Sequence, residues 1–426
     1  MKNIPIGNEK SYKLQLIESV ENFIKKMRWK AIFCNTPNDN KIEMKVNYGL
    51  KSTRCPSQVK ELLPFENDLL ELVKNIKFRK TTNEFQKRMK ADITSIKNSD
   101  KTYTSADKTS NLYKLSPEEY DRLKHNAVTA TYKKASHTIK DRIDRGAVKF
   151  AKNAGLLDRM EKNTTSNCFI TLKDHKQNFM NNPTTRLINP AKNEIGRISK
   201  VTLDNINSKL QESLGVNQWK NSSSVIEWFK GICNKSAYTF SVFDIKDFYP
   251  SITEALLKKA LDFAKTHTDI SDEHMEVIYY ARKSLLFSED STWIKKNGGL
   301  FDVTMGAYDG AEICELVGTF ILNAIGFKYN KREVGLYRDD GLAVFKNLSG
   351  PENEKIKKDF QKIFKENGLD IVIQCNMKVV DYLDITLNLN DGTFKPFRKA
   401  DEETNYINSE SDHPPNIIKQ LPISVG

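Results

Sequence analysis

The sequence predicts an α+β fold with a mostly antiparallel sheet, because strand and helix patterns alternate after residue 237 without a strict βαβ repeat. An apolar run, YTFSVF, indicates a buried strand that leads to Asp244, and the segment GLYRDDGLAVF has the pattern of a tight hairpin. Between them, apolar residues at helical spacing predict a buried helix. The predicted elements are a strand over 238–246, helices over 254–265, 273–286 and 310–325, strands over 333–338 and 342–346, a helix over 353–367, and strands over 370–375 and 379–388.

Residues 1–110 predict a basic and mostly helical N-terminal extension without internal repeats. The stretch KNIKFRKTTNEFQKRMK (74–90) interleaves basic residues with Phe78 and Phe85. This pattern fits either a solvated helix with two core anchors or a contact with a phosphate backbone. The polar stretch NSDKTYTSADKTSN (98–111) predicts a loop.

Residues 111–236 predict a second part, in which helical patterns precede and follow short strands. Ser116 and Glu119 have the spacing of a capping box and predict the start of a helix. The segments NCFITLKDHK and TTRLINPA predict two short strands, separated by the loop QNFMNNP. Ser251 and Glu254 form another capping-box pattern, which predicts the start of the helix after the 238–246 strand.

The formal net charge of +12 favours a polyanionic partner, either nucleic acid or a membrane surface. No apolar run reaches the roughly 18 residues that a membrane span needs. The N-terminus, MKNIPIGNEKSYKLQ, lacks the apolar core of a signal peptide. The six cysteines are scattered without a CxxC pair, which suits a reducing compartment and argues against structural zinc and disulfides. We therefore expect an intracellular protein without a membrane partner, in either the nucleus or the cytoplasm, whose site uses oxygen ligands.

Asp244 stands at the end of an apolar strand, where an uncompensated carboxylate is costly. It marks either an ordinary strand end or a metal site. Asp247 follows at an offset of three and would face the opposite side of a straight strand, so we expect it to cap the turn instead.

Asp339, Asp340 and Gly341 form the predicted tip of the hairpin. An Asp-Gly tip is usually only a turn, but two adjacent like charges repel each other unless a cation lies between them. Before the buried helix, Gly306 and Gly310 bracket a loop where the backbone could approach a ligand or simply turn. Carboxylates in this order are what two-metal phosphoryl transfer with Mg²⁺ requires.

Three segments, FDIKDFYPSI, MGAYDGAE and YRDDGL, resemble motifs A, B and C of reverse transcriptases. Met305 and Asp309 depart from the commoner Pro-Gln-Gly form of motif B. Further segments, among them SADKTSNLYKLSPEEY, TLKDHK and VDYLDITLNLNDGTFKPFRKADEE, resemble the reverse transcriptases of Penelope-like retroelements, which are relatives of telomerase. The resemblance implies an N-terminal extension over 1–110, fingers over 111–236, a palm with motifs A to E over 237–400, and a truncated tail over 401–426 in place of most of the thumb.

The resemblance also implies a role for eight residues. Asp244, Asp339 and Asp340 would hold two Mg²⁺ ions. Tyr249 would exclude a 2′-hydroxyl; the alternative is a packed core tyrosine. The basic residues and the glycine implied are Arg186 and Lys173, which would grip the incoming triphosphate, Lys378, which would protonate the leaving pyrophosphate, and Gly306, which would let its loop lie against the template–primer pair.

The implied function is an RNA-directed DNA polymerase that extends a DNA or RNA primer on an RNA template with dNTPs. Two alternatives are a nucleic-acid-binding remnant that does not polymerise and an RNA-dependent RNA polymerase. Tyr249 and the Tyr-Arg-Asp-Asp sequence count against the last. The oligomeric state is not predicted.

The short segment after the palm leads to two further expectations. With little of a thumb, the basic fingers and the extension would hold the duplex, giving weak binding near physiological salt and short products. We also expect residues Asn416 to Gly426 to be poorly packed.

Overall fold

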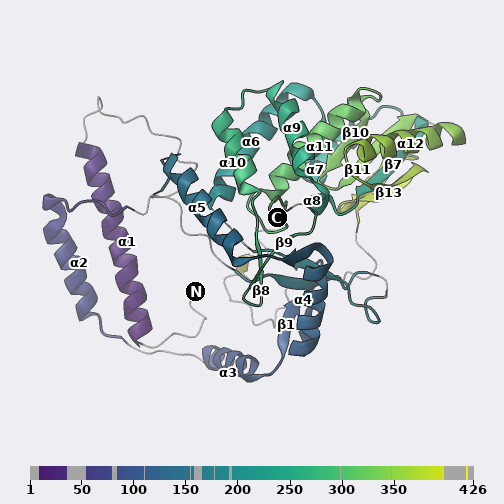
Figure 1. Cartoon of the computed structure of the whole chain (residues 1–426). Coiled ribbons are helices and arrows are strands. Elements are labelled where there is room, and N and C mark those ends of the chain that lie inside the picture. The colour runs from purple at the N-terminus through teal and green to yellow at the C-terminus, as the bar shows by residue number, and fades with distance from the viewer. Residues whose placement is uncertain are drawn as a thin grey trace.

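The computed structural model of the chain (Figure 1) describes residues 9–35, 54–78, 84–109, 111–153, 155–157, 166–176, 178–190, 194–297, 299–346, 348–397 and 419–420. Three N-terminal helices are followed by a mixed body of helices and strands (Figure 1). None of the helices within these ranges is long and apolar enough to cross a membrane.

A five-stranded sheet forms the centre of the mixed body, and the predicted antiparallel arrangement is confirmed. Its middle strand is antiparallel to both neighbours, and one short strand joins the far edge in parallel. In spatial order, the strands are β12 (Ile371–Met377), β7 (Tyr238–Ile245), β11 (Asp340–Lys346), β10 (Val334–Tyr337) and β6 (Asn217–Gln218).

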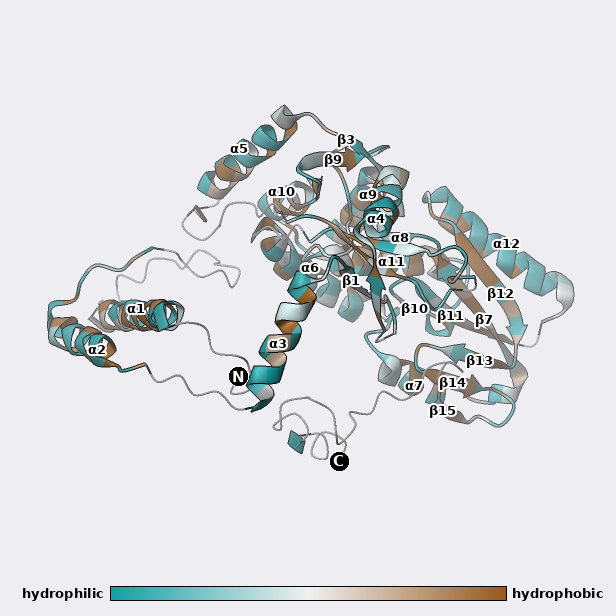
Figure 2. Cartoon of the chain, turned by 90° about the horizontal axis from the view of Figure 1, so that it is seen from below, coloured by the Kyte–Doolittle hydropathy of each residue, from teal (hydrophilic) through white to brown (hydrophobic). Residues whose placement is uncertain are grey.

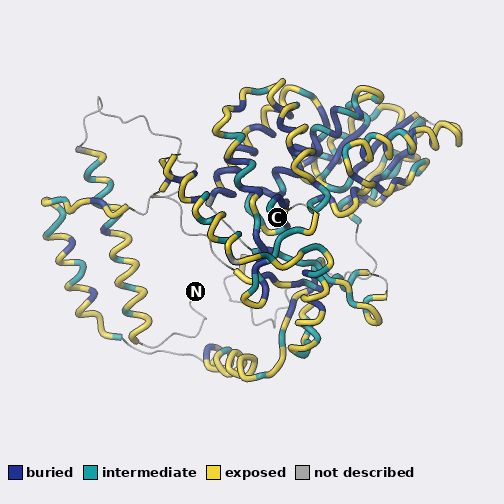
Figure 3. The backbone as a smooth tube through the Cα atoms, in the orientation of Figure 1, coloured by how far each residue is buried: buried dark blue, intermediate teal, exposed yellow. Residues whose placement is uncertain are grey.

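Alternate side chains of β7 divide the core into two layers. Phe243 and Ile245 pack into the larger apolar cluster, whereas Phe240 belongs to a second cluster on the opposite face. Figure 2 shows the apolar character of these strands, and Figure 3 shows how deeply this region is buried. The first face is covered by α6 (Glu194–Leu214), α9 (Glu254–Lys265), α11 (Gly310–Gly326) and α12 (Gly350–Glu366), and the second by α7 (Ser222–Lys230), β13 (Val379–Tyr382) and β14 (Ile385–Asn388).

The helix predicted over 254–265 is confirmed at both ends, but the one predicted over 273–286 is wrong at its C-terminus. That helix, α10 (Asp272–Ala281), stops early because Leu286 enters a strand, β8 (Leu286–Ser288). This strand pairs with β9 (Ser291–Lys295) in a hairpin. The apolar run LLF therefore serves a strand, and periodicity cannot separate the two over so few residues.

The single strand predicted over 379–388 is also wrong, because it is the hairpin of β13 and β14. Leu383, with φ of +52°, lies in the turn between them. The alternating pattern continues through this turn, and no Gly or Asn-Gly marks it. A third strand, β15 (Phe394–Pro396), is antiparallel to β14.

The N-terminal extension is mostly helical where the structure describes it, as predicted. Arg28 of the first helix donates from Nε to Glu66 of the second at 2.6 Å, and both are only slightly exposed. Residues 79–83 of the predicted basic stretch lie outside the described residues. The helices are α1 (Glu9–Asn35), α2 (Leu63–Asn75), preceded by the 3-10 helix η2 (Lys60–Leu62), and α3 (Glu84–Asn98).

The loop predicted over 98–111 is wrong over four residues, because β1 (Thr102–Ser105) lies within it and forms a hairpin with β2 (Leu112–Leu115). Thr104 is buried and donates from its hydroxyl to the Ile170 carbonyl at 2.7 Å. The polar composition hid a strand whose alternate side chain contacts a neighbouring sheet.

The region over 111–236 has the predicted order of helix and short strands. Ser116 caps its first helix by accepting from the Glu119 N–H at 3.1 Å, which confirms that prediction. The two predicted strands are present and pair with each other. The elements are α4 (Pro117–Thr131), β3 (Tyr132–Lys134), α5 (His137–Asn153), β4 (Phe169–Leu172) and β5 (Thr185–Ile188).

The second predicted cap is wrong by two residues. Thr253, not Ser251, caps α9 by accepting from the Leu256 N–H at 3.1 Å. Ser251 ends a short helix, α8 (Phe248–Ser251), and donates to the Lys246 carbonyl at 3.3 Å. The other short helices are η3 (Lys235–Ala237) and η4 (Lys331–Glu333). The predicted tail and its expected loose packing lie outside the described residues, apart from Lys419 and Gln420.

Candidate active site

The three predicted aspartates lie at the same end of the central sheet. Asp340 is directly opposite Asp244 in the antiparallel pair of β11 and β7, so their side chains emerge on the same face. The Ile245 N–H donates to the Asp339 carbonyl at 2.9 Å and holds the β10–β11 turn against the end of β7. The chain between Asp244 and Asp339 includes helices α8 to α11 and the β8–β9 hairpin, so residues far apart in sequence are thereby brought together.

The hairpin turn differs from the predicted one by one residue. It consists of Arg338 and Asp339, since Asp340 already pairs with Tyr337 as the first residue of β11. Arg338 has φ of +54°, a conformation that suits the first turn position of a type II′ hairpin but strains a residue with a side chain. Asp340 therefore belongs to the rigid strand, and Asp339 to the turn.

The charges of Asp244 and Asp339 repel each other. The pKa of Asp244 is raised by partial desolvation and then by the charge of Asp339, with a smaller contribution from Asp247. Lys176 and Lys108 oppose this increase. Neither Asp244 nor Asp339 forms an ion pair with another residue in the described part of the chain. Carboxylates arranged in this way favour an external cation.

The chemistry of this donor set fits Mg²⁺, which prefers carboxylate oxygens together with water and substrate phosphates. Across the ranges that the structure describes, however, no three His, Cys, Asp or Glu side chains form a ready metal-binding group. A site that is completed by the phosphates of the substrate needs fewer protein ligands than a closed protein cage. The role of the three aspartates as metal ligands remains a prediction.

Tyr249 lies in α8, directly after the strand that carries Asp244. It is half-buried beside the larger apolar cluster, and a Cβ on Gly310 would lie 3.2 Å from its Cε1. Burial raises its pKa to about 12, with further contributions from Cys314 and from Asp339. The residue thus has the packing contacts of a core tyrosine and a position near the aspartates, so both interpretations stay open.

The backbone conformation and close packing at residue 306 require a glycine. Its φ is +106°, and a Cβ there would lie 2.5 Å from the Asn189 carbonyl oxygen. The Asn189 N–H in turn donates to the Met305 carbonyl at 3.3 Å, so this loop is attached to the residue after β5. The structure explains the glycine by this close approach, and its contact with a template–primer pair remains a prediction.

Arg186 and Lys173 lie on the same face of the β4–β5 hairpin, as their predicted partnership requires. Arg186 pairs with Thr171, two residues before Lys173. The pKa of Lys173 is lowered by burial and then by the charges of Arg186 and Lys176. Lys108 follows Asp107, whose carboxylate lies 3.2 Å from Arg186 Nε, and we call Arg186, Lys173, Lys176 and Lys108 the basic cluster. Of these, Lys176 and Lys108 act on the charge of Asp244.

Sequence reasoning did not single out Lys108 and Lys176. Both lysines lie in segments that resemble the family, SADKTSN and TLKDHK, and this resemblance could have pointed to them. What places both lysines near the aspartates is tertiary packing, which a local pattern does not contain.

Lys378 is not brought to the aspartates. Its Nζ donates to the carbonyls of Ser236 and Tyr238, at 2.8 and 2.7 Å. Because β12 runs antiparallel to β7, Lys378 comes after the end of β12 that lies beside the start of β7. Asp244 is at the other end of that strand. This placement does not fit the predicted protonation of pyrophosphate. The two hydrogen bonds instead give Lys378 a structural role, because they stabilise the start of β7.

A buried ion pair that the sequence reasoning missed supports the loop with Gly306. Arg282, which follows α10, donates to Asp309, the residue before α11, and both side chains are almost fully inaccessible. Asp309 is one of the two departures from the usual motif B. An ion pair buried so completely fixes the start of α11, because separating its charges leaves one of them uncompensated.

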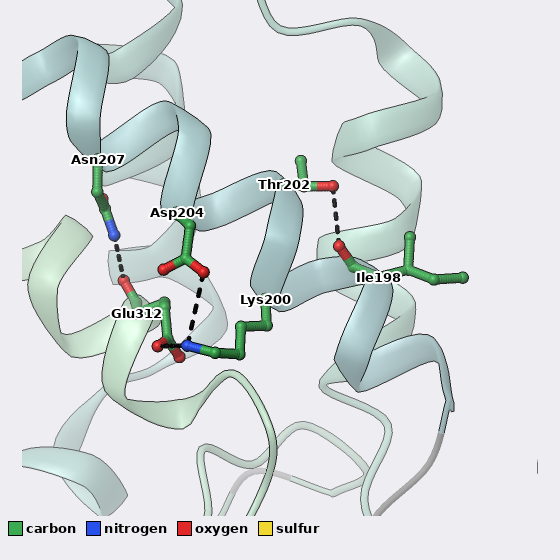
Figure 4. Close-up of polar contacts among 6 residues, drawn as sticks. All are labelled: Ile198, Lys200, Thr202, Asp204, Asn207 and Glu312. Carbon is green, nitrogen blue, oxygen red and sulfur yellow. Dashed lines mark hydrogen bonds and ion pairs between the residues drawn. The ribbon is translucent and has the colours of Figure 1, made fainter. Parts of the chain in front are cut away.

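A second polar group joins α11 to α6 (Figure 4). Lys200 lies between Glu312 and Asp204, with a Lys200–Asp204 distance of 3.6 Å, and the Asn207 side chain donates to the Glu312 carbonyl at 3.0 Å. In the same helix, the Thr202 hydroxyl donates to the Ile198 carbonyl at 3.0 Å. The first turn of α11 is therefore held from two sides.

Comparisons with known proteins bear on the fold. No protein-family model matches the sequence, and no curated protein matches it. Among solved structures, telomerase from Candida albicans in complex with a TWJ fragment of telomeric RNA is similar, with a TM-score of 0.51, 12% identity, and coverage of 80% of this chain and 59% of that one. Apo telomerase from Candida Tropicalis, truncated from its C-terminal domain, has a TM-score of 0.50, 11% identity, and coverage of 80% and 70%.

The chain has a fold similar to that of these two telomerase structures. At this level of identity the likeness extends to the fold alone. The chain also spans only 59% of the length of the Candida albicans telomerase chain. Any activity of this chain is therefore a matter for proposal.

Proposed function

We propose that this chain is an RNA-directed DNA polymerase of a retroelement, of the Penelope-like type, that extends a DNA or RNA primer with dNTPs. The pairing of Asp340 with Asp244, next to Asp339, is the observation that supports this proposal best. It puts three acidic residues at one sheet end in a fold shared with telomerase. The basic cluster near them supplies the opposite charge that a nucleotide would meet.

Asp244, Asp339 and Asp340 would hold two Mg²⁺ ions. When bound, such ions activate the primer 3′-hydroxyl and stabilise the leaving pyrophosphate. The protein contributes the placement of the donors, since Asp244 and Asp340 are fixed by the ladder between β7 and β11. In this assignment 237–400 is the palm.

Arg186 and Lys173 would bind the triphosphate from the fingers, 111–236. Arg186 offers a planar guanidinium that can donate twice to a phosphate, and Lys173 acts as a point charge. Tyr249 would fill the volume of a 2′-hydroxyl on the incoming sugar. The Gly306 loop, held by the Arg282–Asp309 pair, would support the template–primer pair.

A second candidate function is nucleic-acid binding without polymerisation, as in a remnant of a retroelement. The observation in its favour is that no three metal-binding side chains come together in the described part of the chain. The basic cluster and the net charge of +12 serve either function.

A primer-extension assay separates the two candidates. The chain would be incubated with a labelled primer on an RNA template, Mg²⁺ and dNTPs, and a parallel reaction would contain Ca²⁺ instead. We expect extension with Mg²⁺ and dNTPs, and much less with rNTPs. Tight template–primer binding in a filter assay, with no extension in Mg²⁺ or Mn²⁺, would establish the binding remnant instead.

A further inference from the structure

We propose that the turn between β1 and β2 is part of the nucleotide site and that Lys108, at its tip, binds the phosphates of the incoming nucleoside triphosphate together with Arg186. This inference rests on the proposed polymerase function. It adds to the site a segment that precedes both β4, which ends directly before Lys173, and β5, which carries Arg186. It also gives a role to the motif SADKTSN.

The first side of the turn is fixed to the strands of the basic cluster. The Asp107 N–H donates to the Leu172 carbonyl at 2.8 Å, and Ala106 forms a parallel bridge with Leu172. The Asp107 carboxylate lies 3.2 Å from Arg186 Nε and is nearly inaccessible. The residue before Lys108 is thus in direct contact with the arginine that the triphosphate would meet.

The second side of the turn is fixed by one half-buried carboxylate. Asp174 accepts hydrogen bonds from the side chains of Thr109, Asn111 and Tyr113, at 2.5, 2.9 and 3.0 Å. These three residues follow Lys108, whereas Asp174 follows Lys173 in TLKDHK. Asp174 is therefore a positioning residue, because it sets where the turn lies relative to Lys173.

Lys108 itself is exposed between these two anchors. It forms no ion pair with another described residue, yet its charge acts on Asp244 together with that of Lys176. The backbone that carries it is held beside Arg186, because the preceding Asp107 contacts that arginine and donates from its N–H to the Leu172 carbonyl. Asp107 offsets part of the charge of Arg186, so Lys108 supplies positive charge that a polyphosphate would otherwise lack.

Steady-state kinetics of Lys108→Ala test this inference. Loss of one charge-assisted phosphate contact should raise the KM for dNTP roughly 10-fold, with kcat changed by less than about twofold if the contact serves binding alone. Lys108→Arg should restore most of the affinity. Lys114→Ala is the matched control, because Lys114 is an exposed lysine of the same hairpin, on its second strand.

A binding measurement keeps the inference separate from the proposed function. Calorimetric titration of dATP into the complex with a dideoxy-terminated primer, with Ca²⁺ present, measures the Kd without turnover. We expect Lys108→Ala to raise this Kd roughly 10-fold and Lys114→Ala to leave it unchanged, with equal melting temperatures. Equal KM and Kd values in the two variants would overturn the inference while extension by the wild type upheld the function. Weaker template–primer binding with an unchanged Kd for dATP would also overturn it.

Discussion

Two sets of charged residues in this fold differ in whether the protein itself compensates them. Asp244 and Asp339 are like charges at an accessible sheet end, and within the described chain no ion pair compensates either of them. Asp309 is completely buried, and Arg282 compensates it. A charge that the protein itself neutralises is a structural feature, whereas carboxylates left to repel one another indicate a ligand from outside. The comparison predicts that the first set matters for activity and the second for stability.

The largest expected effect is that of Asp339→Asn on primer extension. Removing one carboxylate of the proposed metal site should lower the rate at least about a thousandfold, because metal ions would supply several kcal/mol of transition-state stabilisation. The melting temperature should stay the same or rise slightly, because the substitution also removes the repulsion with Asp244. Single-nucleotide extension and thermal unfolding measure the two effects.

Asp262→Asn provides the matched control, because Asp262 is an exposed aspartate on α9, away from the sheet end. It should extend primers at the wild-type rate. Near-normal extension by Asp339→Asn would show that the hairpin is only a turn. It would contradict the prediction that Asp244 and Asp339 matter for activity.

The opposite side of the comparison predicts a loss of stability for Arg282→Met. Leaving the Asp309 charge buried without a partner should cost about 3–5 kcal/mol of unfolding free energy. The double variant Arg282→Met, Asp309→Leu should recover much of this loss, since both charges are then absent. Urea unfolding of the two variants and the wild type measures it. A single variant as stable as the wild type would mean that the pair contributes nothing.

These two sets also show what sequence reasoning can reach. Asp244 and Asp339 were found because each stands next to an apolar strand, a pattern contained within about ten residues. The Arg282–Asp309 pair has no such local pattern, because tertiary packing brings together the residues after one helix and before another. The helices predicted over 254–265, 310–325 and 353–367 followed from periodicity for the same local reason.

The direction of a strand explains why Lys378 does not lie beside the aspartates. Lys378 occupies the expected place in the sequence, but the pairing of β12 with β7 carries it to the far end of the sheet. The turns at Leu383 and Arg338 were misplaced because both have positive φ without glycine. Sequence patterns give the order of strands more securely than the position of a residue along a partner strand.

A smaller effect is expected for Tyr249→Ala, which tests the neighbourhood of the aspartates. Removing the ring should reduce discrimination between dNTP and rNTP by about 1–3 kcal/mol, the range for one steric contact. Tyr249→Phe is the control, because it keeps the ring and should preserve selectivity. Competition between dATP and ATP in single-nucleotide extension measures the ratio. Unchanged selectivity in Tyr249→Ala, with reduced stability, would assign the residue to the core.

The smallest effect on activity is expected for Lys378→Met. This variant tests whether Lys378 has the catalytic role that the family resemblance implies or the structural role that its hydrogen bonds indicate. A lysine that protonates pyrophosphate would leave kcat lower by about 100-fold or more when it is removed. The structure instead engages Lys378 with the carbonyls of Ser236 and Tyr238, so the substitution should cost about 1–2 kcal/mol of unfolding free energy. We therefore expect a lower urea midpoint and a kcat within about twofold of the wild type. A side chain that only stabilises the start of β7 does not take part in proton transfer. Lys378→Arg, which retains donors for both carbonyls, should recover the stability. A large fall in kcat with no change in the unfolding midpoint would mean that Lys378 leaves these carbonyls during turnover and reaches the nucleotide after all.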